Sequence, residues 1–161
     1  MNSSSEIDYS ILRNLLAAGE WKEANKETKR VVLAATKSDR IIRDFPCEDL
    51  RIIDQLWVEY SNGRFGFSVQ KRIYESVYES ICERWGRTEK YGIRSFNEFG
   101  DQVRWRTKEQ WNYYLDLVYD LWAPVGHLPS YNIVFLEGEF WGARLMEVAE
   151  SIFCCLEDCG L

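Results

Sequence analysis

The stretch Tyr60-Ser-Asn-Gly-Arg-Phe-Gly-Phe-Ser-Val-Gln70 lies between two helical patterns and predicts where the chain turns back on itself. Its Asn-Gly pair is typical of a turn, because both residues tolerate a left-handed backbone. Gly66 lacks a side chain and therefore lets the backbone come close to a ligand. Phe65 and Phe67 on either side of it can form one wall of a slot for a flat apolar ligand, or they can simply fill the corner between two helices.

Helical periodicity extends from this corner in both directions and predicts an all-α fold. Before the corner, a helix is expected from near Pro46 to about Tyr60, and after it another from about Ser68 to Arg84. Four more helices are expected: one capped by Asp8, one starting at Glu20, one starting at the capping box of Thr107 and Gln110, and one over roughly residues 140–158. Residues 85–106 have no clear period and are expected to form a long loop.

The length and composition favour one folded domain. The chain has 161 residues, 46% of them apolar and 29% charged, which suits a single helical domain over residues 1–161 with its core between about 8 and 158. No apolar run approaches the ~20 residues that span a bilayer. The first residues are serine-rich and acidic and do not resemble a secretory signal.

Charge and aromatic residues are concentrated in the same part of the chain. The net charge is −6, yet the segment from Arg64 to Lys108 holds ten Lys and Arg against six Asp and Glu. Twenty of the twenty-four aromatic residues lie between Trp57 and Trp141. This overlap fits a flat ligand with acidic edges, whose carboxylates Arg64, Lys71 and Arg72 could meet, and it also fits single-stranded nucleic acid. The overall negative charge argues against nucleic acid as the main partner.

The five cysteines predict reduced thiols and no metal site. An odd number of cysteines in a chain without a recognisable signal favours a cytosol-like compartment. Cys154, Cys155 and Cys159 crowd the last residues, but their spacing matches no zinc motif, and the chain has only one histidine to complete a site.

Catalytic signatures are absent from the sequence. The single histidine, His127, has no Ser or Cys motif around it, and the glycines of the corner lack the Lys-Ser/Thr ending of a phosphate loop. Asp116 and Asp120 are four residues apart, which more often marks a solvated helix face than an acid–base pair. We therefore predict a protein that is not an enzyme.

Several segments together resemble one known family. They are Ala18-Gly-Glu-Trp-Lys-Glu-Ala24, Phe45-Pro-Cys-Glu-Asp-Leu50, Ile53-Asp-Gln-Leu-Trp57, the corner stretch itself, and Ala123-Pro-Val-Gly-His-Leu-Pro129. These segments closely resemble the Genomes Uncoupled Four family over about residues 8–152, with the cyanobacterial members and their diverged paralogues as the nearest type. The Gly-Arg-Phe-Gly-Phe-Ser-Val-Gln block is the most specific of them.

The resemblance implies an all-helical protein with a cupped ligand surface between two loops. It implies binding of a porphyrin, either protoporphyrin IX or magnesium-protoporphyrin IX, with a linear bilin as a further possibility. It also implies a regulator of magnesium chelatase in chlorophyll synthesis, with the large chelatase subunit as protein partner. The expected location is the cytoplasm or the plastid stroma, with peripheral contact to a photosynthetic membrane.

By the same resemblance, Val58 and Phe67 belong to the first wall of the cup, Trp105 and Tyr119 to the second, and Arg144 pairs with a propionate. The expected ligand-binding residues are Val58, Arg64, Phe65, Phe67, Gln70, Trp105, Tyr119, His127 and Arg144.

The sequence also departs from the family pattern. Val125 stands where the family usually has arginine, and losing a hydrogen bond to a charged group costs about 1.5–3 kcal/mol. This departure and the terminal thiols keep two alternatives open. The first is a sensor for bilin, which would need a reachable thiol such as Cys47 or Cys82, or for haem, with His127 as a weak candidate ligand. The second is a protein-interaction module that has lost its ligand.

Overall fold

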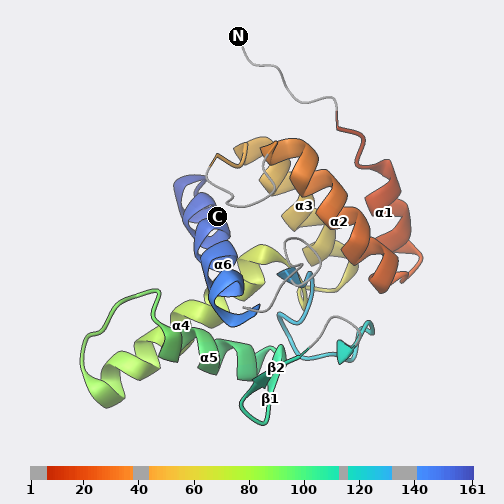
Figure 1. The fold of residues 1–161 in the computed structure, drawn as a ribbon. Coiled ribbons are helices and arrows are strands. Elements are labelled where there is room, and N and C mark those ends of the chain that lie inside the picture. Colours follow the sequence, from red (N-terminus) through yellow and green to blue (C-terminus); the bar gives the residue numbers. More distant parts are fainter. Residues whose placement is uncertain (1–6, 38–43, 113–115, 132–140) are drawn as a thin grey trace.

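The structure is a computed structural model and describes residues 7–37, 44–112, 116–131 and 141–161, the last with side chains from Leu145 onward. These residues form six helices and one two-stranded hairpin, so the predicted all-α class is confirmed. In Figure 1, α1, α2 and α3 gather on one side and α4 and α5 on the other, with α6 between the two groups. In this part of the chain, no helix is both long enough and apolar enough to cross a bilayer.

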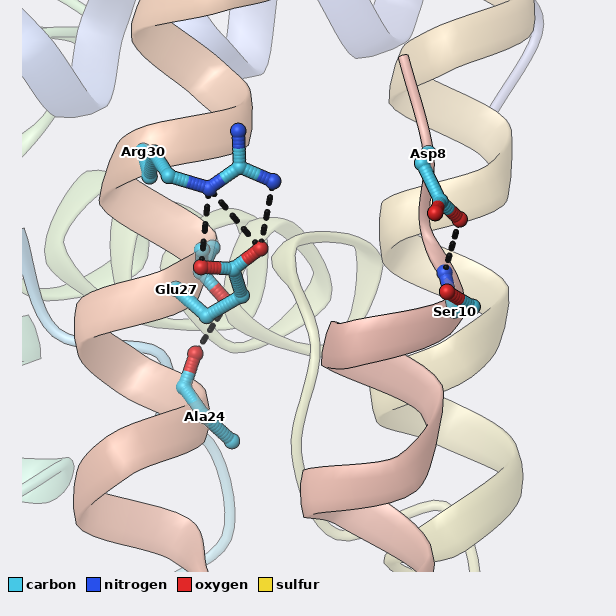
Figure 2. A network of polar contacts seen from close by, with 6 residues as sticks. Asp8, Ser10, Ala24, Glu27 and Arg30 are labelled. Atoms are coloured by element: carbon cyan, nitrogen blue, oxygen red, sulfur yellow. Dashed lines mark hydrogen bonds and ion pairs between the residues drawn. The ribbon is translucent and has the colours of Figure 1, made fainter.

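The first two helices form the hairpin that the sequence predicted. α1 (Ser10–Ala17) and α2 (Trp21–Thr36) are joined by a short turn. The Asp8 carboxylate accepts a hydrogen bond of 2.9 Å from the Ser10 amide (Figure 2), but the N-cap residue of α1 is Tyr9 and not the predicted Asp8. Glu27 and Arg30 form an ion pair of 2.6 Å on α2 (Figure 2). The predicted inner face of α2 is buried: Trp21, Ala24, Thr28, Val31 and Ala35.

The next two helices meet at the corner stretch. α3 (Cys47–Tyr60) follows Pro46, and α4 (Phe67–Trp85) begins directly after Gly66. Both helices therefore lie where the periodicity predicted them. α3 is fastened to α2 through the Trp57 indole N–H, which donates to Thr28 Oγ1 at 2.9 Å.

The segment after α4 differs from the sequence prediction in two ways. Within the expected loop, α5 (Ile93–Gln102) is a helix, because Phe96 and Phe99 bury its short apolar face. The helix expected from Thr107 is wrong, since this region holds the hairpin of β1 (Arg106–Thr107) and β2 (Gln110–Trp111).

The hairpin is stabilised by its turn and by α5. Lys108 and Glu109 have φ of 50° and 65°, the left-handed pair that a two-residue hairpin turn requires. The Trp111 ring stacks 4.9 Å from the Phe96 ring. A Cβ on Gly100 would lie 2.4 Å from the Trp111 ring, so the glycine makes room for that ring. The capping-box pattern was thus overridden by a tertiary contact.

The last helix, α6 (Trp141–Asp158), was predicted at almost the same bounds. Phe153 on α6 packs against Tyr74 of α4 and Phe99 of α5, with ring centroids 5.4 Å and 6.0 Å away. These contacts join α6 to the contiguous core that also includes α1, α2 and α3.

One cysteine pair corrects the expectation of reduced thiols. Cys47, the first residue of α3, forms a disulfide with Cys159, directly after α6, and their Cα atoms are 5.4 Å apart. Cys82, Cys154 and Cys155 carry free thiols. The pairing depends on the packing of two helix ends that are 112 residues apart in sequence, and no spacing rule reveals such a contact.

Candidate functional site

The corner between α3 and α4 is held by close contact between the two helices. Gly66 has φ of 135°, and a Cβ there would lie 2.8 Å from Val58 Cγ2 and 3.0 Å from Asp54 Oδ1. The Ser68 amide donates to the same Asp54 oxygen at 2.8 Å. Gly66 therefore allows α3 and the start of α4 to approach each other closely at the corner.

The aromatic and amide side chains of the corner are buried. Phe65 packs edge-on against Trp21 at 5.6 Å, and Phe67 lies 6.0 Å from the Tyr131 ring. Gln70 is fully buried, and its Oε1 accepts a hydrogen bond of 2.6 Å from the Tyr131 hydroxyl. The corner thus contributes structure to the core and to the segment that ends at Tyr131.

A second segment, residues 116–131, is bonded onto this corner. Its backbone is mostly irregular, and the Leu128–Pro129 peptide is cis. The Gln70 amide donates to the carbonyls of Gly126 and Pro129 at 3.0 and 2.8 Å. The Gly66 amide donates to the Leu128 carbonyl at 3.1 Å. The segment is therefore held in place by the polar groups of the corner motif.

Arg64 connects the two segments at their outer edge. Its Nη2 donates to the Ala123 carbonyl at 2.7 Å, and its own carbonyl accepts from the Gly126 amide at 2.7 Å. Its Nε is buried, and no hydrogen-bond partner for it is found among the described residues. Arg64 therefore fastens residues 116–131 to the corner through its side chain and its backbone carbonyl.

His127 and Trp105 belong to the same buried network. The Trp105 indole donates to the His127 carbonyl at 2.7 Å. His127 Nε2 accepts from the Val118 amide at 3.0 Å, so the proton sits on Nδ1, which lies 2.6 Å from the Val103 carbonyl. Burial lowers the pKa of His127. Both ring nitrogens are occupied, which leaves neither free to ligate a haem iron.

Exposed apolar side chains distinguish the outer part of residues 116–131. Val118, Trp122 and Val125 are 38%, 89% and 43% exposed. Trp122 is held outward by a turn in which its amide donates to Asp120 Oδ1 at 2.8 Å. These three side chains expose apolar surface on the segment that Arg64 fastens to the corner.

The helix expected from Thr107 gave no reason to single out Val118 or Trp122, whereas Val125 was already identified as the departure from the family's arginine. The contiguous apolar run Leu121-Trp-Ala-Pro-Val125 was the signal that could have identified Trp122. A contiguous apolar run that contains a proline does not fit a helical stripe.

The structure describes two of the remaining predicted site residues in full. Val58 is half-buried at the end of α3, and Tyr119 is half-buried with Lys22 Nζ 5.9 Å from its ring centroid. Arg144 is in the first turn of α6, but its side chain lies outside the described residues. The structure thus brings together Arg64, Phe65, Phe67, Gln70, Trp105 and His127, with only Arg64 of that group partly exposed.

Much of the basic segment is neutralised by local ion pairs. Four of its cations are within 4 Å of a carboxylate: Lys71 with Glu75, Arg84 with Glu98, Lys90 with Glu157, and Arg106 with Asp101. Lys71 therefore has an acidic partner already, and Arg64 is the basic group that bridges the two segments.

Comparison with known proteins identifies related chains. A family model described as GUN4-like matches residues 2–148. The protein named "Tetrapyrrole-binding protein, chloroplastic" from Arabidopsis thaliana is 26% identical over 140 residues, covering 77% of this chain and 48% of that protein. The "Ycf53-like protein" of Synechocystis sp. is 31% identical over 162 residues, covering 95% of this chain and 60% of that protein. The chain thus spans about half the length of the curated relatives it matches.

Solved structures share the fold over almost the whole chain. The ligand-free structure of Arabidopsis thaliana GUN4 aligns with a TM-score of 0.66 at 21% identity and covers 95% of each chain. The structure of GUN4 from Chlamydomonas reinhardtii aligns with a TM-score of 0.62 at 26% identity, covering 95% of this chain and 92% of that one.

Proposed function

The chain belongs to the GUN4-like family, and from that premise we propose that it binds a tetrapyrrole and catalyses no reaction of its own. One observation carries the proposal: the exposed apolar side chains of Val118, Trp122 and Val125 lie on the segment that Arg64 fastens. A tetrapyrrole combines a flat apolar body with carboxylate edges. It therefore matches an exposed aromatic ring on a segment that a partly exposed arginine fastens.

The site residues divide into two groups in this proposal. Val58 and Tyr119 contact the macrocycle together with Trp122, while Arg64 and Arg144 pair with its propionates. The other residues support this surface from behind and keep residues 116–131 in place: Phe65, Phe67, Gln70, Trp105 and His127. Because they are buried, replacing them is expected to alter stability first and ligand affinity only as a consequence.

The finer proposal concerns ligand and partner. Protoporphyrin IX and magnesium-protoporphyrin IX are the proposed ligands, and the large subunit of magnesium chelatase is the proposed partner in chlorophyll synthesis, in the cytoplasm or stroma and at the membrane periphery. A linear bilin has the same two propionates and remains an alternative ligand. The relative's name, which refers to tetrapyrroles in general, supports the class of ligand only.

Parallel titrations test the ligand. We expect saturable changes in visible absorbance, together with quenching of tryptophan fluorescence, when the chain is titrated with protoporphyrin IX, its magnesium form or deuteroporphyrin at micromolar concentration. Haem and a bilin are titrated alongside. The absence of saturable change with every tetrapyrrole would refute the binding proposal, and a response to the bilin alone would replace porphyrin as the ligand.

A matched pair of tryptophan variants locates the site. Trp122 and Trp85 are both exposed, at 89% and 68%, but only Trp122 lies on the proposed surface. We expect Trp122→Ala to weaken porphyrin binding by roughly tenfold, because a flat aromatic ligand stacked on an aromatic side chain gains about 1–3 kcal/mol. Trp85→Ala should leave the affinity unchanged. Equal effects of the two substitutions would place the ligand elsewhere.

Chelatase stimulation is measured separately from binding. The chain is added to purified magnesium chelatase, and the rate of magnesium insertion into deuteroporphyrin is followed. We expect a higher rate with the unaltered chain than with Trp122→Ala. Binding without stimulation would retain the tetrapyrrole proposal and exclude the regulatory one.

A further inference from the structure

The disulfide lies at the end of the molecule where α3 begins and α6 ends. Cys47 opens α3, and Cys159 follows the last residue of α6. The covalent loop it closes therefore contains α3 to α6, residues 116–131 and every candidate ligand residue from Val58 to Arg144. A bond between such distant positions restricts the unfolded chain strongly, because the closed loop is long.

The two sulfur-bearing residues differ in accessibility. Cys47 is half-buried, whereas Cys159 is only 6% exposed. A reductant from solvent therefore reaches the Cys47 sulfur more readily. A bond of this accessibility in a chain with three additional free thiols is more typical of a reversible disulfide than of a permanently buried one.

The surrounding thiols are arranged so that the pairing stays specific. Cys155 lies one helical turn before Cys159 and is buried. Burial raises the pKa of the Cys155 thiol, so little of the nucleophilic thiolate forms there to attack the bond. Cys154 is exposed, and its sulfur lies 4.0 Å from the Tyr91 hydroxyl. Its contact is therefore with Tyr91 and not with the disulfide.

We propose that the Cys47–Cys159 disulfide is a redox-controlled latch, which a dithiol reductant opens and an oxidant closes, and which sets how firmly α3 and α6 are held together. This inference is independent of tetrapyrrole binding and concerns the stability of the fold.

Reduction of the disulfide by a dithiol proceeds through two thiol–disulfide exchange steps. One thiolate of the reductant attacks the Cys47 sulfur, a mixed disulfide forms, and Cys159 leaves as a thiolate that takes up a proton. The second thiol of the reductant then attacks the mixed disulfide and releases Cys47 as a thiol. The protein gains two electrons and two protons, and the reductant becomes a cyclic or intramolecular disulfide.

Opening the latch is expected to loosen the molecule without unfolding it. The Arg51 guanidinium still donates to the Cys159 carbonyl, and the Leu161 amide still donates to the Leu156 carbonyl at 2.8 Å. The Phe153 contacts with Tyr74 and Phe99 are likewise unaffected. The reduced chain therefore retains α6 on the core, with less resistance to thermal unfolding.

A redox titration tests whether the latch operates under native conditions. The full chain is equilibrated with reduced and oxidised dithiothreitol at varied ratios, quenched with acid, alkylated in denaturant so that buried thiols also react, and analysed by intact mass. We expect three alkylated cysteines at the oxidised end, five at the reduced end, and one two-electron transition between them. Five alkylated cysteines throughout would overturn the proposal, and so would a bond that survives a large excess of reduced dithiothreitol.

Thermal unfolding tests the effect on stability. For a closed loop of this length we expect the reduced chain to melt roughly 10 °C lower than the oxidised chain. The double variant Cys47→Ser with Cys159→Ser, checked by circular dichroism for helix content, should melt at the reduced value with or without reductant. Cys154→Ser is the control and should respond like the unaltered chain. Identical melting temperatures for the oxidised and reduced unaltered chain would overturn the latch.

Discussion

The corner at Tyr60–Gln70 and the segment at 116–131 are bonded to each other, yet they present opposite kinds of surface. The corner contains the most distinctive sequence block of the chain, and its two phenylalanines and its glutamine are buried. The segment has little regular structure, and Trp122 on it is largely exposed. The corner acts as a scaffold, and the segment supplies the apolar surface.

The corner shows that a distinctive motif can be buried and still hold a neighbouring segment in place. The Gln70 amide and the Gly66 amide both hydrogen-bond to the segment. An irregular segment can keep a fixed shape only if its backbone polar groups find partners. The motif supplies those partners, so its side chains determine the position of a surface they do not themselves form.

The largest effect is expected from a substitution at Gly66, where α3 and the start of α4 approach each other closely. Gly66→Ala should destabilise the protein by about 3 kcal/mol or more, because a Cβ there meets Val58 and Asp54 within 3.0 Å and the backbone has positive φ. Gly63→Ala is the matched control, since Gly63 also has positive φ but has no atom within 4 Å of the added Cβ. Urea unfolding measures both, and equal losses would show that strain alone matters.

The next effect separates scaffold from surface. Gln70→Leu leaves two backbone carbonyls and the Tyr131 hydroxyl without their partner, and we expect a loss of about 2–4 kcal/mol in the free energy of unfolding. Gln55→Leu, on the exposed side of α3, is the control and should change stability by less than about 0.5 kcal/mol. A neutral Gln70→Leu would mean that residues 116–131 do not depend on the corner.

In residues 116–131, a substitution at Val125 is expected to increase the affinity for the ligand. Val125 is 43% exposed beside the turn that Arg64 fastens, so Val125→Arg adds a guanidinium at the proposed propionate edge. We expect roughly tenfold tighter binding of deuteroporphyrin, equivalent to about 1.4 kcal/mol. The dimethyl ester of deuteroporphyrin, which has no free carboxylates, should bind both proteins equally. An equal gain with the ester would contradict propionate pairing.

The smallest expected effect is a pH dependence of stability from His127. Its folded-state pKa is lowered by burial, so the unfolded chain takes up a proton first as the pH falls through about 6.5. The contribution of neutral His127 to the free energy of unfolding is therefore fully present above that pH. Below it, this free energy declines by at most about 1.4 kcal/mol per pH unit for one proton. Urea unfolding between pH 7.5 and 5.5 measures this slope.

The variant His127→Gln is the comparison for that slope. It should lower the stability at every pH, because the bonds to Val103 and Val118 are altered, and it should remove most of the pH dependence in this range. A slope that persists in His127→Gln would assign the proton uptake to another group.

Four long helices and the all-α class were accessible from the sequence, because their apolar stripes extend over several turns. α2 buried the face that its spacing predicted, and α4 buried Val69, Val77 and Ile81 of its predicted stripe but left Ile73 half-buried. α5 and the hairpin at Arg106–Trp111 were not accessible. The helix is too short to show a clear period, and the hairpin depends on how the Trp111 ring packs over Gly100. The capping-box pattern at Thr107 is a local sequence preference. Tertiary packing overrides such a preference when the two favour different structures.

The candidate site was predicted in part. The sequence identified both segments and placed an arginine at their edge, but it could not distinguish a phenylalanine that faces a ligand from one that fills a core. Phe65 and Trp122 are both large aromatic residues near glycine or proline, and one is buried while the other is 89% exposed. The difference arises from neighbours distant in sequence, such as Trp21 for Phe65.

The sequence by itself determined where the long helices and the corner lie and which family the chain resembles, because these depend on spacing and on local motifs. Only the tertiary structure decided that the corner motif is a buried scaffold, that Trp122 faces outward and that Cys47 meets Cys159. The physical reason is the same in each case. Burial, satisfaction of polar groups and covalent pairing depend on contacts between positions far apart in the chain, and these contacts exist only after the helices have packed.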